Sequence, residues 1–196
     1  IRENGVPTYL AADIAYHRDK FHRGFKQVIN LWGADHHGYI ARMKAAVGAL
    51  GFDPDRLEVI ILQMVSLYQN GEQVKMSKRT GQGVTLSELI EEVGRDAARF
   101  FFIMRSTDSQ LDFDLDLAKS QTSDNPVYYI QYAHARICSI FRQAKEAGVV
   151  MPAVRDTDLT VLALPVETEL IKKILSFKEE TELAALRREP HRMARY

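Results

Sequence analysis

Val28-Ile29-Asn30-Leu31-Trp32-Gly33-Ala34-Asp35 is the stretch of sequence that decides the fold. A short apolar run that ends at a glycine is typical of a buried strand. A helical pattern follows to about Leu50, where Gly51 supplies a left-handed stop, and Asp35 is placed to cap this helix. A second β-branched run covers residues 57–64. Strand, turn, helix and strand in this order predict a βαβ unit in a parallel sheet.

Shorter signals predict the elements that follow. Asn70-Gly71 separates two β-type runs and predicts a two-residue hairpin. Thr85 and Glu88 have the spacing of a capping box, which would begin a helix that ends at Gly94. A further helix is predicted over 96–105, so this half of the chain is α/β.

The composition changes beyond this α/β half. Aspartates become frequent, and we interpret them as an acidic linker with a boundary within 107–123. Pro126 suits the first turn and Gly148 the end of a helix of about five turns. We therefore predict two domains, 1–110 and 111–196, the second entirely helical. Its other helices are expected over 165–177, 181–188 and from Pro190 onward.

Composition limits the class of protein. Of the 196 residues, 46% are hydrophobic and 27% charged, which is usual for a soluble globular protein. Basic and acidic residues number 26 each, so any footprint for nucleic acid must be local. The single cysteine, Cys138, excludes an internal disulfide and a cysteine-based zinc site, and favours a cytoplasmic setting. The sequence contains no apolar run as long as a membrane span.

Gly33-Ala34-Asp35-His36-His37 follows a predicted strand, where open α/β sheets bind ligands. Gly33 permits close backbone approach, Asp35 can hold ribose hydroxyls, and a helix N-terminus favours phosphate. The alternative interpretation is a simple helix cap. Adjacent histidines on a helix face different directions, so we expect no metal shared by His36 and His37.

Lys75-Met76-Ser77-Lys78-Arg79 precedes the polar run Thr80-Gly81-Gln82-Gly83. A loop of this kind can place two charges and backbone N–H groups against a polyphosphate. The alternative is a solvated basic turn.

Tyr9 and Asp13 are four residues apart, which places a phenol and a carboxylate on one face of a predicted helix. Together they could receive a cationic side chain. The alternative is a carboxylate favoured by the helix dipole beside a packed tyrosine.

These stretches together resemble class I aminoacyl-tRNA synthetases, and specifically arginyl-tRNA synthetases of the bacterial type. The similarity covers essentially the whole chain, and the lysine loop takes the place of the family's KMSKS loop. It rests on 9–20, 32–39, 75–79, 96–105, 112–118 and 125–136. The resemblance implies an α/β fold, the C-terminal half of a class I Rossmann-like nucleotide-binding domain, followed by an all-α helical bundle of the anticodon-binding type.

The same resemblance implies ATP-dependent ligation of L-arginine to tRNA(Arg) through an arginyl-adenylate. Mg²⁺ would accompany ATP, and no structural metal is expected. Tyr9 and Asp13 would hold arginine, whose guanidinium fork a carboxylate can accept bidentately. The catalytic residues would be Lys75, Ser77 and Lys78. The ATP-binding residues would be Gly33, Asp35, His36, His37 and Met76.

The His-x-Gly-His element of class I enzymes is absent from this sequence, and Ile1 is not a start methionine. We therefore expect a piece that begins midway through the catalytic domain and is inactive alone, from a cytoplasmic, monomeric parent without a membrane partner. One alternative is another class I synthetase; the cysteinyl enzyme is nearest in layout, but its zinc-binding cysteines are missing. The other is a non-catalytic nucleotide- or tRNA-binding module.

Overall fold

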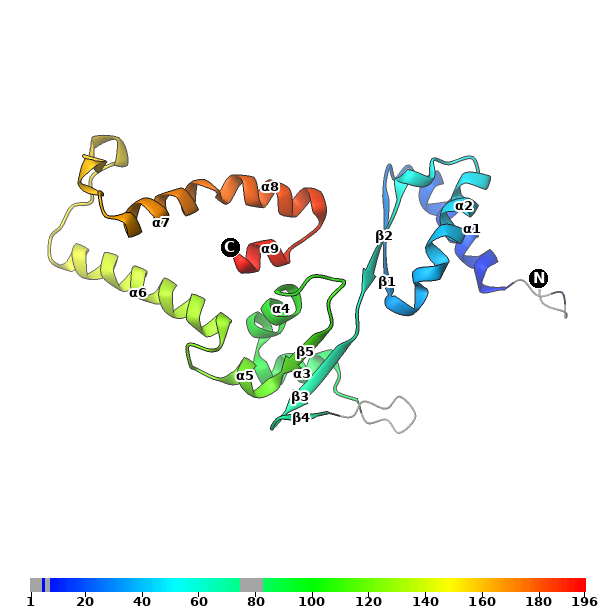
Figure 1. The fold of residues 1–196 in the computed structure, drawn as a ribbon, viewed down its shortest axis with the longest axis horizontal. Coiled ribbons are helices and arrows are strands. Elements are labelled where there is room, and N and C mark those ends of the chain that lie inside the picture. The colour runs from blue at the N-terminus through cyan, green and yellow to red at the C-terminus, as the bar shows by residue number, and fades with distance from the viewer. Residues whose placement is uncertain (1–4, 6–7, 75–82) are drawn as a thin grey trace. The chain divides into compact units, whose positions relative to one another are not determined.

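The computed structural model describes residues 5, 8–74 and 83–196 (Figure 1). The predicted catalytic loop, with Lys75, Met76, Ser77 and Lys78, lies outside the described residues. Contacts divide the chain into two compact units. Unit 1 comprises Ile1–Met64 with Thr107–Gln110, and unit 2 comprises Val65–Ser106 with Leu111–Tyr196.

Unit 1 contains the predicted βαβ arrangement. Strand β1 (Val28–Gly33) pairs in parallel with β2 (Leu57–Leu62), from Val28 opposite Leu57 to Gly33 opposite Leu62. The connection is helical, and a further helix precedes β1 (Figure 1). These helical elements are α1 (Tyr9–His22), the 3-10 helix η1 (Ala34–Tyr39), α2 (Ile40–Ala49) and the 3-10 helix η2 (Pro54–Arg56).

One face of β1 is buried rather than both. On the inward face of β1, Val28 belongs to a core that also contains Phe21, Met43, Val47 and Leu57. Between these inward positions, Ile29 is 44% exposed and Leu31 63% exposed. Alternate residues of a strand point to opposite faces, and the helices that the structure describes in unit 1 cover one face of β1.

Asp35 does not cap α2, contrary to the sequence-based expectation. The six residues of η1 lie between β1 and α2, and Asp35 is inside this 3-10 helix. Helix α2 begins only at Ile40, where Tyr39 provides no side-chain cap. The helical pattern was predicted correctly, but its first turns are 3-10, so the carboxylate lies too early in the chain to reach the free N–H groups of α2.

Unit 2 is built around strand β3 (Val65–Gln69). It pairs antiparallel with β4 (Glu72–Gln73) and parallel with β5 (Leu111–Asp114). The predicted hairpin is confirmed, with both turn residues at positive φ. The predicted capping box is also confirmed: the Glu88 amide donates to the Thr85 hydroxyl oxygen at 3.2 Å and the Thr85 amide to the Glu88 carboxylate at 2.7 Å. Helices α3 (Leu86–Val93) and α4 (Arg95–Ile103) follow, joined at Gly94.

The acidic stretch is structured, so its interpretation as a linker was wrong. It forms β5 and helix α5 (Leu115–Lys119), and the apolar residues among its aspartates enter the core. Phe113 is 0% exposed and Leu115 1% exposed. The Asp114 carboxylate accepts hydrogen bonds from the amides of Asp116 and Leu117, and so caps α5. The aspartates are therefore the polar face of a strand and the cap of a helix.

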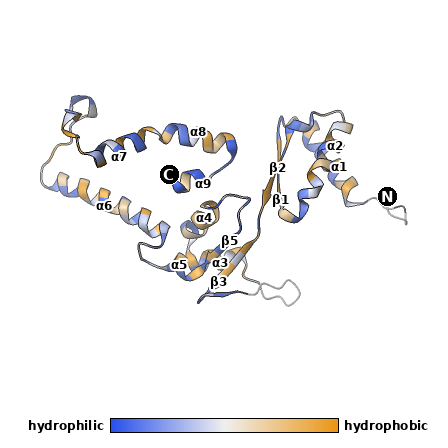
Figure 2. Ribbon diagram, viewed as in Figure 1, coloured by the Kyte–Doolittle hydropathy of each residue, from blue (hydrophilic) through white to orange (hydrophobic). Residues whose placement is uncertain are grey.

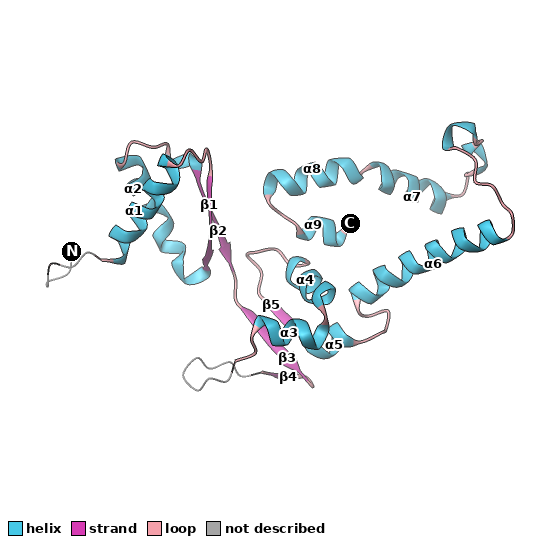
Figure 3. Cartoon of the chain, turned by 180° about the vertical axis from the view of Figure 1, so that it is seen from behind, coloured by secondary structure: helices cyan, strands magenta, loops and turns pink. Residues whose placement is uncertain are grey.

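Beyond β5, the described elements are all helical (Figure 3). Asn125 caps α6, whose apolar and polar residues alternate around the helix (Figure 2). Several of its apolar residues are exposed, including Phe141 at 54%. No described helix combines the length and apolarity that crossing a membrane requires. The helices are α6 (Pro126–Glu146), α7 (Pro165–Leu175), α8 (Phe177–Arg187) and α9 (His191–Arg195), with 3-10 turns η3 (Val154–Asp156) and η4 (Leu159–Val161).

Candidate functional site

A pocket of about 430 Å³ lies within unit 1, between α1, β1 and η1. This volume lies in the range of small-molecule sites in proteins. Each of these three elements contributes side chains to the lining. The lining residues are Tyr9, Asp13, Tyr16, His17, Lys20, Asn30, Trp32, His36 and Tyr39.

The two predicted arginine-binding residues line this pocket together. Tyr9 and Asp13 lie one turn apart near the start of α1, as their spacing indicated. Both are solvent-exposed, with Tyr9 at 82%, so a ligand could reach them without a rearrangement of the core. Among the described residues that line the pocket, Asp13 is the one carboxylate.

One of the four described residues predicted to bind ATP joins them. His36 lines the pocket, whereas Gly33, Asp35 and His37 do not. The Asp35 carboxylate folds back over the strand end, since a Cβ on Gly33 would lie 2.7 Å from its Oδ1. Asp35 also faces His36 at 3.6 Å, but both side chains are more than half exposed, so this pair contributes little to stability.

Sequence reasoning missed a polar chain behind the predicted residues. Nδ1 of His17 lies 2.7 Å from the backbone oxygen of Asp13, and Nε2 lies 2.7 Å from Nδ2 of Asn30. Oδ1 of Asn30 accepts from the Lys20 ammonium at 3.5 Å. His17 is 4% exposed and Asn30 8% exposed. The spacing that singled out Tyr9 and Asp13 continues to His17, and this was the available signal.

Aromatic rings form much of the remaining wall. Trp32 and Tyr39 meet edge to face, with centroids 5.9 Å apart, and the Lys20 ammonium lies 4.2 Å from the centroid of Tyr16. Aromatic faces attract cations, and a carboxylate attracts them more strongly. Lys20 is already held by Asn30 and Tyr16, so the Asp13 carboxylate and the aromatic rings together can receive a cation. The described residues contain no group of three potential metal ligands.

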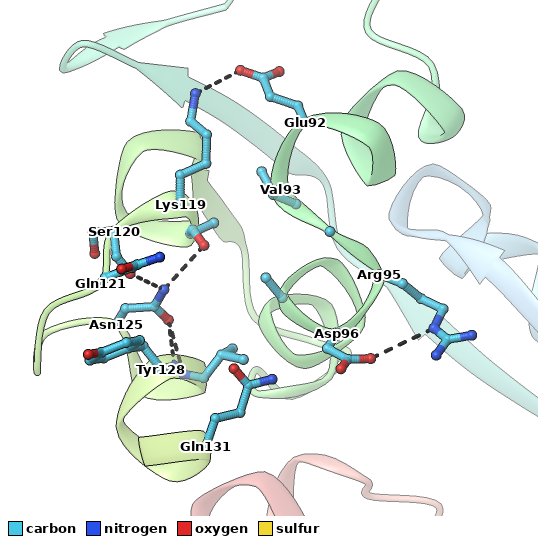
Figure 4. Close-up of a pocket in the computed structure, with 14 residues that line it drawn as sticks. Glu92, Val93, Arg95, Asp96, Lys119, Ser120, Gln121, Asn125, Tyr128 and Gln131 are labelled. Carbon is cyan, nitrogen blue, oxygen red and sulfur yellow. Dashed lines mark hydrogen bonds and ion pairs between the residues drawn. The ribbon is translucent and has the colours of Figure 1, made fainter. Parts of the chain in front are cut away.

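A second pocket, of about 640 Å³, lies within unit 2 where α3, α4, α5 and α6 meet (Figure 4). Its charged groups pair with one another: Lys119 contacts Glu92 at 2.9 Å and Arg95 contacts Asp96 at 3.7 Å. The hydrogen bond to Glu92 is the main reason that the pKa of Lys119 is raised. Asn125 is buried and fully engaged at the helix end, as Figure 4 shows. None of the described residues that the sequence predicted for the arginine or ATP sites lines this second pocket.

Comparison with known families assigns the helical part. Residues 130–196 match the DALR anticodon binding domain. Among curated proteins, the arginine–tRNA ligase of Moorella thermoacetica is 63% identical over 196 residues, which is 100% of this chain and 35% of the relative. That of Carboxydothermus hydrogenoformans is 61% identical with the same coverage. The chain therefore spans about a third of the length of the curated relatives it matches.

Two solved structures also match the whole chain. A protein of Campylobacter jejuni assigned as an arginyl-tRNA synthetase superposes with a TM-score of 0.87 at 44% identity, covering 100% of this chain and 42% of the other. The arginyl-tRNA synthetase of Thermus thermophilus superposes with a TM-score of 0.74 at 22% identity, covering 100% of this chain and 40% of the other. The second comparison shows the fold alone.

Proposed function

Because the chain belongs to the arginyl-tRNA synthetase family, we propose that it supplies part of the arginine and ATP sites of an ATP-dependent ligase. The reaction joins L-arginine to tRNA(Arg) through an arginyl-adenylate. The observation that carries the proposal is the unit 1 pocket, which contains Tyr9, Asp13 and His36 together.

Arginine binds with its guanidinium against Asp13. The carboxylate offers two oxygens to the fork of N–H donors, a geometry that the compact ammonium of lysine does not match. Tyr9 contributes its hydroxyl one turn earlier on α1. The rings of Trp32 and Tyr39 give the planar cation an aromatic wall.

ATP binds beyond the carboxyl end of β1. Ligands of open α/β sheets bind at this edge, which is where Gly33, Asp35, His36 and His37 lie. Asp35 holds the ribose and Met76 is a further ATP-binding residue. Lys75, Ser77 and Lys78 are the catalytic residues, and Mg²⁺ accompanies ATP. Lysine charges that are already in place stabilise the negative charge that develops on phosphate oxygens.

We assign residues 1–110 to the C-terminal part of a class I Rossmann-like catalytic domain and 111–196, whose described elements beyond β5 are helical, to the anticodon-binding domain. The family match over 130–196 supports the second assignment. The tRNA is then a macromolecular partner of the helices from α6 onward. We further propose that the intact protein is cytoplasmic and monomeric.

The decisive experiment is arginine-dependent ATP–pyrophosphate exchange by the intact natural protein, with tRNA present. In Asp13→Asn, loss of one charge-assisted hydrogen bond, about 1.5–3 kcal/mol, raises the KM for arginine roughly ten- to a hundredfold. The KM for ATP stays unchanged. Asp19→Asn is the matched control, since Asp19 is an exposed residue of the same helix and does not line the pocket.

Three results would contradict the proposal. Exchange that depends on cysteine would assign a different class I synthetase. Nucleotide or tRNA binding without exchange for any amino acid would indicate a non-catalytic module. An unchanged KM for arginine in Asp13→Asn would remove that residue from the site.

A further inference from the structure

We propose that His17 and Asn30 are positioning residues, which hold the Asp13 turn of α1 against β1 and so set the geometry of the arginine subsite. This inference rests on the proposed function. It concerns two buried residues that act through Asp13 and need not touch a substrate.

The direction of each hydrogen bond follows from the atoms involved. A backbone carbonyl only accepts, so Nδ1 of His17 carries the hydrogen that is donated to the Asp13 oxygen at 2.7 Å. In the neutral ring, Nε2 is then an acceptor, and it faces the Asn30 amide nitrogen at 2.7 Å. Asn30 turns its oxygen to the ammonium of Lys20. Each hydrogen-bond donor in this set therefore faces an acceptor.

This polar chain of hydrogen-bonded residues connects the two halves of the candidate site. It begins at the backbone of Asp13, the residue proposed to accept the guanidinium. It reaches β1 at Asn30, three residues before Gly33, where the proposed nucleotide-binding residues begin. The polar chain thus links the turn that carries the Asp13 carboxylate to the strand that leads to the proposed ATP site.

Burial makes this connection specific. An apolar contact tolerates sliding, whereas His17 or Asn30 moved out of register would leave a buried polar atom unpaired, at a cost of about 1–3 kcal/mol. Displacement of a reacting group by about 1 Å can cost a hundredfold in rate. A fixed α1 therefore matters for the placement of Asp13, which is itself on the surface of the helix.

The test is Asn30→Asp in the intact protein. The substitution conserves shape but replaces the donor that faces Nε2 of His17 with a carboxylate oxygen, beside Lys20. We expect the KM for arginine to rise about tenfold, with the KM for ATP within twofold.

The control is Val47→Ala, which weakens the same core from α2 without touching the polar chain. A purely structural role would make Asn30→Asp behave like this control, with a lower melting temperature and no selective change in the KM for arginine, and would overturn the inference. If Asn30→Asp does not fold, His17→Gln, which loses the bond to Asp13, should raise the same KM. Absence of arginine-dependent exchange in the wild type would instead overturn the proposed function, and this inference with it.

Discussion

Replacement of Phe113 by alanine tests whether the acidic stretch is part of the core of unit 2. The Phe113 side chain is 0% exposed in β5, and its ring lies 5.3 Å from the rings of both Phe101 and Phe102. Its removal takes away the transfer free energy of a whole ring and leaves a cavity that those two neighbours only partly fill. Substitutions of this kind cost about 3–5 kcal/mol.

A loss of this size is large compared with the stability of a domain, which is about 5–15 kcal/mol. Urea unfolding followed by far-UV circular dichroism would measure it, because most of the helices belong to unit 2. The single tryptophan, Trp32, lies in unit 1 and provides a separate fluorescence signal for that unit.

The matched control is Phe141→Ala, the same substitution in the same unit at a residue that is 54% exposed. It should cost less than about 1 kcal/mol. A similarly small cost for Phe113→Ala would refute the packing argument and return the acidic stretch to the role of a solvated linker.

Two further predictions concern α3 and its end. The backbone N–H and the hydroxyl of Thr85 hydrogen-bond the Glu88 carboxylate and lower its pKa, so its stabilising effect is complete above the unfolded pKa and is lost as pH falls through the folded one. Glu88→Gln should therefore lower the melting temperature at pH 7, and its difference from wild type should disappear in acid; a constant difference would contradict this. Gly94 has φ +83 and ψ 152, and a Cβ there would meet nothing within 4 Å. Gly94→Ala should thus cost about 1–3 kcal/mol in urea unfolding through backbone strain alone, whereas Gly38→Ala, also in open space but without positive φ, should cost little.

Elements specified by neighbouring residues could be predicted without coordinates. The Asn70-Gly71 hairpin, the capping box at Thr85 and the glycine stop at Gly51 all depend on interactions within a few residues. The parallel βαβ unit was also predictable, because its order of elements leaves few other arrangements. The spacing of Tyr9 and Asp13 likewise indicated a shared helix face, which both residues present to one pocket.

Other features depended on which surfaces meet. The sequence around Asp112 and Asp114 was interpreted as a linker. In the structure it forms β5, which pairs with β3, and the apolar neighbours of the two aspartates lie in the core. The apolar pattern of α6 predicted a helix correctly, but it did not reveal that Phe141 on that helix is exposed. In both cases the pattern specifies a local conformation, whereas burial requires a partner distant in the chain.

The sequence by itself determined the order of the elements in the βαβ unit, the hairpin at Asn70-Gly71, the capping box at Thr85 and the residue types available near β1, because these follow from backbone preferences and hydrogen bonds between near neighbours. Only the tertiary structure decided that His17 meets Asn30, that His36 joins Tyr9 and Asp13 while Asp35 turns back over Gly33, and that an acidic stretch is half core. These outcomes depend on the packing of a helix against a strand, where the positions of whole elements decide which polar atoms find partners.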